Sequence, residues 1–183
     1  MTLFKAKYRV DSARLQGWDY TSAAWYFVTL CTKDKKCFFG EIVNEQMTIS
    51  PIGAIVAEEW NKTPEVRSGT DLDEWILMPN HLHGIIVIGS RAKETPHRET
   101  PHRCVSTSTS RLQKNSLGAM IGQFKSVCTK RIWAAAFKNF AWQPRYYDHV
   151  IRDEKSLRAI REYIVNNPAK WQLDKDNPIG LRM

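Results

Sequence analysis

The segment 81–88 (HLHGIIVI) constrains the fold more than any other part of the chain. Every residue after Gly84 in it is apolar, and a strand that is apolar on both faces is typical of the centre of a sheet covered on both sides. Before it, Pro79-Asn80 is a turn-forming pair that follows a second apolar run at 74–78 (EWILM). We therefore predict a β-hairpin from these two runs, and a hairpin excludes an all-parallel sheet.

The other elements follow from the spacing of apolar residues. Segments 25–32 (WYFVTLCT), 41–50 (EIVNEQMTIS) and 146–151 (YYDHVI) have the composition of strands. Helices are expected from Ser50-Pro51, from near Ser116, and from Asp153 to Asn167-Pro168. Their apolar stripes contain Ile52, Ile55, Val56 and Trp60 in the first helix, Leu117, Met120, Ile121, Phe124, Cys128 and Ile132 in the second, and Leu157, Ile160 and Ile164 in the third. This order predicts an α+β domain with a mainly antiparallel sheet and helices packed on it.

The chain has the size and composition of one globular domain, which we place at residues 1–183. Of its 183 residues, 43% are hydrophobic and 25% charged, which argues against a disordered, collagen-like or disulfide-stapled protein. Its apolar runs are far shorter than a membrane span, its start lacks a signal-peptide segment, and its cysteines form no CxxC pair. We therefore expect a cytoplasmic protein that does not enter a membrane and whose thiols are reduced.

Residues 90–115 differ from the rest of the chain. They are poor in apolar residues and contain the pentapeptide ETPHR twice, at 94–98 and at 99–103. A duplicated polar segment cannot bury a core face, so we predict a mobile loop here. The recurrence of His97 and His102 follows from the duplication, and neither is a predicted metal ligand.

The charge balance favours a polyanionic partner. The chain has 27 basic and 19 acidic residues, a formal net charge of +8 and an isoelectric point near 9.4; a solvated basic surface has the same composition. Aromatic rings beside cations suit unpaired bases and a phosphate backbone. On this basis we predict DNA contacts at Trp142, Arg145, Tyr146, Lys125, Lys130 and Arg131, and Tyr147 belongs to the same aromatic group. The alternative is that half of these aromatic residues belong to the core.

His81 and His83 are the most informative pair in the sequence. Successive side chains on a strand alternate faces, so both imidazoles project from one side, about 7 Å apart along the chain. Two ligands are too few for a structural zinc centre. Together with oxygen ligands they suit a catalytic Mg²⁺, Mn²⁺ or Zn²⁺. The alternative is two partly exposed histidines that are hydrogen-bonded to backbone near a turn.

Tyr163 and Asn167 offer the groups that the histidine pair lacks, a further metal ligand and an attacking group. They stand at positions i and i+4 of the third predicted helix, on a face that borders Ile160 and Ile164. A phenol and an amide oxygen on that face can reach one ion, the amide as a ligand and the phenol as the attacking group. Alternatively, Tyr163 is a core residue with a solvated hydroxyl and Asn167 ends the helix. The four residues together indicate phosphodiester cleavage by tyrosine.

Three stretches together resemble the HUH single-strand DNA nucleases that use one catalytic tyrosine, and above all the REP-associated tyrosine transposases. They are 75–88 (WILMPNHLHGIIVI), 142–152 (WQPRYYDHVIR) and 161–171 (REYIVNNPAKW), in the order found in that family. The resemblance covers roughly residues 20–172. The first and last motifs are specific in combination, whereas an HxH triplet or a tyrosine alone is not.

The resemblance implies a ferredoxin-like sheet and assigns the metal ligands to His81 and His83, the nucleophile to Tyr163 and the third ligand to Asn167. It also implies a 5′-phosphotyrosine intermediate on hairpin-bearing single-stranded DNA, with Mg²⁺ or Mn²⁺ as the cofactor. Because the covalent link keeps the phosphodiester energy, a 3′-hydroxyl of another strand can reverse the step and join DNA without ATP. We expect a monomer or homodimer that is associated with the nucleoid.

Two other functions fit the same residues. One is a nucleic-acid-binding module without catalysis. The other is a metal-dependent hydrolase in which His81 and His83 activate water and Tyr163 is structural. Tyr146 and Tyr147 are rival nucleophiles, but a phenol there lacks an amide partner at i+4. A free phenol has a pKa of about 10, and the sequence identifies no clear proton acceptor beyond His149 or a water.

Overall fold

A computed structural model describes residues 15, 17–89 and 115–173 of the chain. Its centre is an antiparallel sheet in the order β4-β5-β1-β6. The sheet strands are β1 (Ala24–Cys31), β4 (Thr70–Met78), β5 (His81–Ile88) and β6 (Tyr147–Ile151). The helices are α1 (Pro51–Asn61), α2 (Thr63–Val66), α3 (Leu117–Ala134) and α4 (Glu154–Val165), with short 3-10 segments η1 (Lys33–Lys35) and η2 (Pro168–Leu173).

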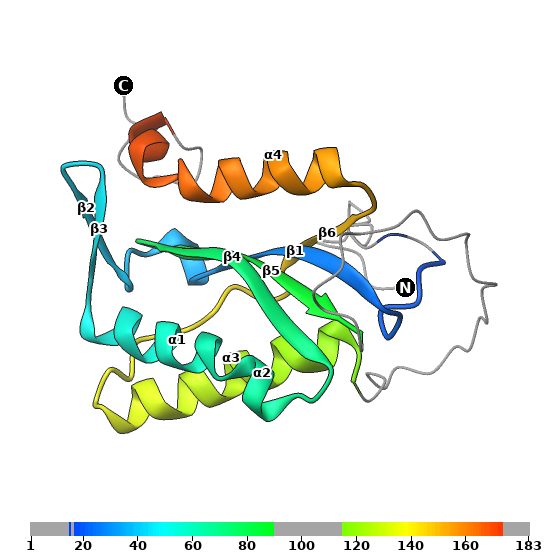
Figure 1. Cartoon of the computed structure of the whole chain (residues 1–183). Coiled ribbons are helices and arrows are strands. Elements are labelled where there is room, and N and C mark those ends of the chain that lie inside the picture. Colours follow the sequence, from blue (N-terminus) through cyan, green and yellow to red (C-terminus); the bar gives the residue numbers. More distant parts are fainter. Residues whose placement is uncertain (1–14, 16, 90–114, 174–183) are drawn as a thin grey trace, which may run out of the picture.

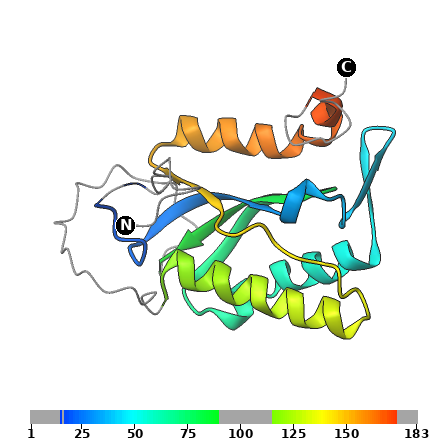
Figure 2. The same cartoon turned by 180° about the vertical axis from the view of Figure 1, so that it is seen from behind.

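The order of elements along the chain produces three layers. The succession β1, α1, β4, β5, α3, β6 places α1 and α3 together on one face of the sheet, and α4 lies on the other face (Figures 1 and 2). The strand order is that of a ferredoxin-like sheet. The predicted α+β class and the mainly antiparallel sheet are confirmed.

Each face of the sheet has its own core. The larger core packs sheet residues against α1 and α3 and includes Tyr26, Val28, Leu30, Leu82, Ile86, Val56, Trp60, Leu117, Ile121, Phe124, Cys128 and Ile132. The smaller core packs the other sheet face against α4 and consists of Trp25, Phe27, Ile85, Val87, Ile151, Leu157 and Ile164. The apolar run in β5 is therefore covered on both sides, as predicted.

The predicted helix starts are confirmed by their caps. The side chains of Ser50, Ser116 and Asp153 accept hydrogen bonds from the backbone N–H groups three residues ahead, at 3.0, 3.3 and 2.8 Å. These bonds satisfy N–H groups that have no partner inside the helix. The cap at Asp153 leaves only a short link between β6 and α4, so the position of β6 fixes where α4 begins.

Two sequence predictions need correction. Segment 41–50, predicted as one strand, is a separate hairpin of β2 (Gly40–Val43) and β3 (Gln46–Ile49). Its turn is Asn44-Glu45, both with positive φ, so the chain reverses inside a run of strand-like composition. The strand before β5 also begins earlier than predicted, at Thr70, because a bulge between Leu72 and Trp75 interrupts its alternation.

Some residues named from the sequence lie outside the described part of the chain. The predicted loop at 90–115 lies outside the described residues except for Asn115, and so do His97, His102 and Cys104. Cys37 and Cys128 are free cysteines.

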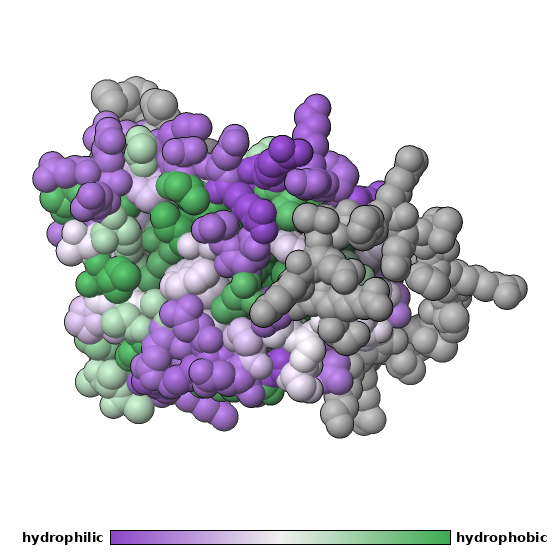
Figure 3. Space-filling model, viewed as in Figure 1, coloured by the Kyte–Doolittle hydropathy of each residue, from purple (hydrophilic) through white to green (hydrophobic). Residues whose placement is uncertain are grey.

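The surface is mixed in character. Hydrophilic residues gather over α4 and over the helices of the opposite layer, and hydrophobic surface shows between them at the level of the sheet (Figure 3). None of the helices in the described part of the chain has the length and apolar character needed to cross a membrane.

Gly84 provides a test of the packing around β5. A methyl group there would lie 2.5 Å from Cζ2 of Trp60, whose side chain is fully enclosed in the larger core. We expect Gly84→Ala to lower the free energy of unfolding by about 1–3 kcal/mol because neither strand nor indole can move freely. Urea denaturation measures this change. Combining it with Trp60→Phe, which removes the clashing atom, should reduce the loss; an equal loss in both backgrounds would contradict the clash.

Candidate active site

His81 and His83 project from the face of β5 that α4 covers. Their ring centroids are 4.4 Å apart with planes inclined at 66°, and the side chains are 0% and 4% exposed. Leu82 between them lies in the larger core on the other face. The prediction that both imidazoles share one side of the strand is confirmed, and it follows from the two-residue period of the strand.

Asn80 determines how His81 is oriented. The Asn80 side-chain NH₂ donates to the carbonyl oxygen of Lys35 at 3.0 Å, which fixes the orientation of the amide. Its Oδ1 therefore faces Nδ1 of His81, at 2.8 Å. Because an amide oxygen only accepts, Nδ1 carries the hydrogen and the lone pair of the ring lies on Nε2. A buried imidazole held in this tautomer is suited to be a metal ligand through Nε2.

His83 lies between a threonine and the predicted nucleophile. Its Nδ1 is 2.9 Å from Oγ1 of Thr29 on the neighbouring strand β1, and its Nε2 is 3.2 Å from the phenol oxygen of Tyr163. A phenol that donates to Nε2 requires the hydrogen of His83 on Nδ1, where the Thr29 hydroxyl can accept it. In that tautomer Nε2 of His83 accepts a hydrogen bond from the Tyr163 phenol, a partner that the sequence did not identify.

Tyr163 is held beside His83 while remaining open to solvent. Its ring stands edge-on to Phe27 at 6.2 Å and packs against the His83 ring at 5.1 Å. Phe27 in turn stacks on His83 at 5.4 Å. The Tyr163 side chain is nevertheless 44% exposed. A group that touches the histidine pair and is also reachable from solvent can attack a bound phosphate.

Asn167 follows Tyr163 by one turn, just beyond the end of α4. Residues before and after it in the chain contact the histidine pair. The ring of Tyr163 packs against His83, and the ring of Trp171 in η2 lies 6.0 Å from that of His81. Asn167 is 3% exposed, and its Oδ1 is a buried oxygen that accepts no hydrogen bond in the described part of the protein. A buried carbonyl oxygen without a donor is costly unless a ligand satisfies it.

The donor set limits what the site can hold. Within the described ranges, no cluster of three or more histidine, cysteine, aspartate or glutamate side chains is placed to bind a metal. A cation here would need the amide oxygen of Asn167 in addition to the two imidazoles. Two nitrogens and one neutral oxygen would leave coordination positions for water or phosphate oxygens.

An ion pair fixes α4 on the sheet. Arg161 donates from Nε and from a terminal nitrogen to the two carboxylate oxygens of Asp73 on β4, at 2.7 and 2.6 Å. Its guanidinium also lies 5.7 Å from the ring of Trp25. Burial acts to raise the pKa of Asp73, but the hydrogen bonds from Arg161 and the backbone outweigh it and the pKa is lowered. Since Arg161 is two residues before Tyr163, this ion pair helps to set the position of the phenol.

The residues predicted to contact DNA near β6 are in part structural. Trp142 is partly buried and packs against the larger core beside Phe39, Phe124 and Phe140. Tyr146 is half-buried against the same core, whereas Arg145 is exposed with a positive φ of 66°.

Lys125 is also engaged within the protein. It donates to the carbonyl oxygens of Gln143 and Arg145 at 2.9 and 2.6 Å, and burial lowers its pKa to about 8. Its ammonium lies 5.5 Å from the ring of Trp142. Lys125 therefore stabilises the segment that leads into β6.

The other two predicted basic contacts lie on α3, in the layer opposite α4. Arg131 forms ion pairs with Glu58 and Glu59 of α1, so its charge is offset. Lys130 is exposed. The structure does not bring these residues together with the histidine pair, because the sheet lies between the two layers. Their contact with DNA stays a prediction.

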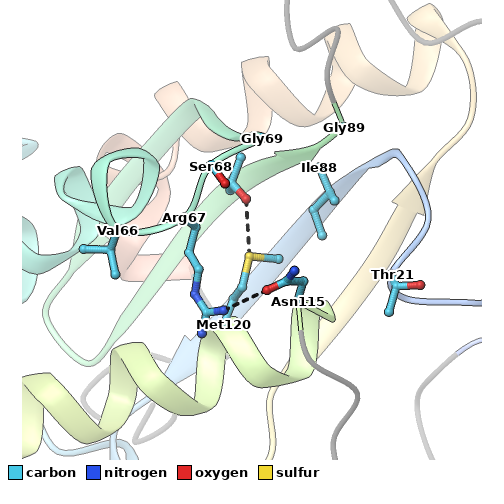
Figure 4. Close-up of a pocket in the computed structure, with 10 residues that line it drawn as sticks. Thr21, Val66, Arg67, Ser68, Gly69, Ile88, Gly89, Asn115 and Met120 are labelled. Carbon is cyan, nitrogen blue, oxygen red and sulfur yellow. Dashed lines mark hydrogen bonds between the residues drawn. The ribbon is translucent and has the colours of Figure 1, made fainter.

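A cavity of about 340 Å³ lies at the end of β5 remote from the histidines (Figure 4). Its lining includes Arg67, which donates to the side-chain oxygens of Asn115 and Gln123. Thr70 approaches the sulfur of Met120 there at 3.5 Å. None of the candidate site residues lines it, so this cavity is separate from the active site.

Several residues of the site were missed in the sequence. Asn80 was interpreted only as a turn residue, although an asparagine directly before a histidine ligand is a signal for an orienting hydrogen bond. Thr29 reaches His83 through strand register, and Asp73 reaches Arg161 across 88 positions. The sequence carries no local signal for either pairing.

Comparison with known proteins finds a relative by sequence and a solved structure with the same fold. No protein-family model matches the chain. It is 37% identical over 166 residues to an uncharacterized protein of Haemophilus influenzae, in a match that covers 90% of this chain and 91% of that protein. Among solved structures, a REP-associated tyrosine transposase bound to a REP hairpin is similar with a TM-score of 0.52 and 19% identity, over 84% of this chain and 71% of that one. This second likeness shows a shared fold.

The Asp73–Arg161 ion pair generates a pH-dependent prediction. Because the pKa of Asp73 is lowered in the folded protein, its stabilisation is complete above the ordinary carboxyl range near 4 and is lost as the pH falls through the folded value. We expect Asp73→Asn to cost about 1 kcal/mol of unfolding free energy at pH 7. The cost should shrink toward pH 3 in chemical denaturation experiments.

Glu154→Gln is the matched control. It removes a carboxylate from α4, the helix that carries Arg161. There the exposed Glu154 lies 3.8 Å from Arg158. This change should have little effect at any pH. A cost of Asp73→Asn that is independent of pH, or no larger than that of the control, would contradict the role assigned to the pair.

Proposed function

The chain belongs to the same family as the Haemophilus influenzae protein, and we propose that it is a transposase-like enzyme that cleaves and joins single-stranded DNA through Tyr163. The observation that carries this proposal is the 3.2 Å contact between the Tyr163 phenol and Nε2 of His83, two residues 80 positions apart in the chain. A solvent-open phenol beside a pair of buried imidazoles has the composition of a site for nucleophilic attack on a phosphodiester.

A divalent cation, Mg²⁺ or Mn²⁺, is the proposed cofactor, with His81, His83 and Asn167 as its ligands. The fit rests on the tautomer that Asn80 imposes on His81 and on the buried Oδ1 of Asn167, which accepts no hydrogen bond in the described structure. When bound, the cation would neutralise charge on a non-bridging oxygen of the scissile phosphate.

Tyr163 is the proposed catalytic residue. Its phenol oxygen forms a bond to phosphorus while the bond from phosphorus to the 3′-oxygen breaks, which leaves a 5′-phosphotyrosine and a 3′-hydroxyl. The phenol proton must leave, since a free phenol is almost entirely neutral at pH 7. Nε2 of His83 can accept that proton or bind a cation, but one lone pair cannot do both. If His83 held the cation, the phenol would lose its hydrogen bond to the ring and its proton would pass to water.

The reverse step joins DNA. The phosphotyrosine keeps the energy of the phosphodiester, so a 3′-hydroxyl from another strand can displace Tyr163 without ATP. We propose hairpin-bearing single strands as the substrate; the structurally similar transposase is bound to a REP hairpin. His83 and Tyr163 meet within one chain, so a monomer is sufficient to form this part of the site.

Substitution of the nucleophile tests the reaction. Incubation with Mn²⁺ and a labelled hairpin oligonucleotide should give a protein–DNA adduct that survives denaturing electrophoresis. Tyr163→Phe keeps the ring that packs on Phe27 and His83 but removes the attacking oxygen. We expect it to reduce adduct formation to background, at least about 10³-fold.

Tyr147→Phe is the matched comparison for the nucleophile, because it removes only the hydroxyl of a second exposed tyrosine on the same sheet face and keeps its ring. An adduct should still form in this variant. DNA cleavage that persists in Tyr163→Phe without an adduct would favour a hydrolase that activates water. DNA binding with no cleavage under any divalent cation would favour a binding module.

Metal affinity tests the ligand set separately from activity. Asn167→Ala removes a proposed ligand, and Asn80→Ala removes the group that orients His81. Each should weaken Mn²⁺ binding, measured by titration calorimetry, by about 10- to 100-fold. Asn166→Ala is the matched control, since Asn166 is exposed and its amide bonds to the Glu162 carbonyl instead. Equal Mn²⁺ affinity in all three variants would exclude this ligand set.

A further inference from the structure

We propose that the part of the sheet beside Tyr163 is a binding site for an unpaired DNA base, with the ring of Tyr147 as its stacking platform. We call this region the β6 flank and define it as Tyr147 and His149 of β6 with Thr29 and Phe27 of β1. The inference rests on the proposed function and deepens it, because it states how the enzyme would hold the single strand next to the cleaved bond.

The β6 flank lies on the same face of the sheet as the histidine pair. Thr29 is paired in register with His83 on one side and with Tyr147 on the other. Residues paired across strands point to the same face, so the three side chains form one row. Two strand spacings separate the backbones of His83 and Tyr147, about 10 Å. The flank is therefore close to any phosphate that Tyr163 attacks.

Helix α4 leaves the β6 side chains of this flank, Tyr147 and His149, uncovered. The helix packs mainly against β4, where Asp73 and Arg161 fix it, on the side of the sheet remote from β6. As a result Tyr147 is 51% exposed, and His149 is exposed as well. An aromatic side chain on a sheet face that a helix partly covers would normally be buried. Here the covering element stops short of it.

The flank is built like a stacking surface. The Tyr147 ring stands edge-on to Phe27 at 6.4 Å with planes inclined at 70°. Phe27, which is only 8% exposed, also contacts Tyr163 edge-on, at 6.2 Å. The two exposed tyrosines thus flank one buried phenylalanine, which limits the motion of both. A fixed ring with an open face binds any unpaired base by stacking, at a small entropic cost.

Other aromatic residues of this region do not offer such a surface. Trp142 and Tyr146 were also predicted to contact DNA, but both pack against the larger core. Tyr147 is the member of that group whose ring is mostly exposed and lies on the histidine face. The stacking role therefore falls on Tyr147.

Equilibrium binding tests the site without relying on catalysis. The probe is a fluorescein-labelled hairpin with a single-stranded thymidine tail, titrated in EDTA with the Tyr163→Phe protein and followed by anisotropy. Adding Tyr147→Ala should weaken binding about tenfold or more, whereas Tyr147→Phe should bind like the parent because the ring remains. The dependence of affinity on salt should not change, since a stacking residue neutralises no phosphate. Phe137→Ala, at an exposed aromatic beyond the end of α3, is the matched control.

Other outcomes would overturn the proposal. These are an unchanged affinity in Tyr147→Ala, an equal loss in Phe137→Ala, or an equal loss for a blunt hairpin without a tail. If one of these three results is found while the protein with Tyr163 intact still forms the phosphotyrosine adduct normally, only the proposed role of the β6 flank is contradicted. Absence of the adduct would contradict the proposed function, whatever the binding shows. Loss of the adduct in Tyr147→Phe but not in Tyr163→Phe would make Tyr147 the nucleophile and overturn both assignments.

Discussion

The contact between Tyr163 and His83 is the interaction on which this account depends. It joins the last helix to a central strand 80 positions earlier in the chain. A small apolar core, the Asp73–Arg161 ion pair and the short link from β6 hold α4 in place. If α4 moved by one turn, the phenol would lose the imidazole, because one turn of helix is about 5.4 Å long.

The two faces of the sheet differ in how completely helices cover them. The face that carries α1 and α3 holds most of the core and therefore most of the stability. The opposite face is covered only in part, so the rings of Tyr147 and Tyr163 stay exposed beside Thr29 and the buried histidine pair. For the proposed reaction, a rigid central strand would fix the imidazoles and the incompletely covered face would let a substrate reach Tyr163.

The sequence predicted the relative positions of the histidine pair and of Tyr163 and Asn167 better than it predicted the packing around them. The two-residue period of a strand placed His81 and His83 on one side, and the helical period placed Tyr163 one turn before Asn167. Those are local rules. Other contacts depend on strand register and layer packing, which join residues far apart in the chain. These are the contact of Thr29 with His83, the ion pair of Asp73 with Arg161 and the packing of Trp142 against the larger core. The hairpin at 41–50 was missed because its turn residues lie within a run of strand-like composition.

Mass-spectrometric mapping of the trapped protein–DNA adduct tests the central claim most directly. Trypsin separates the two candidate regions, because Tyr163 is the one tyrosine of fragment 162–170 while Tyr146 and Tyr147 share fragment 146–152. The account predicts that a nucleotide linked through its 5′-phosphate is found on fragment 162–170. A nucleotide on fragment 146–152, or cleaved DNA with no modified tyrosine, would contradict it.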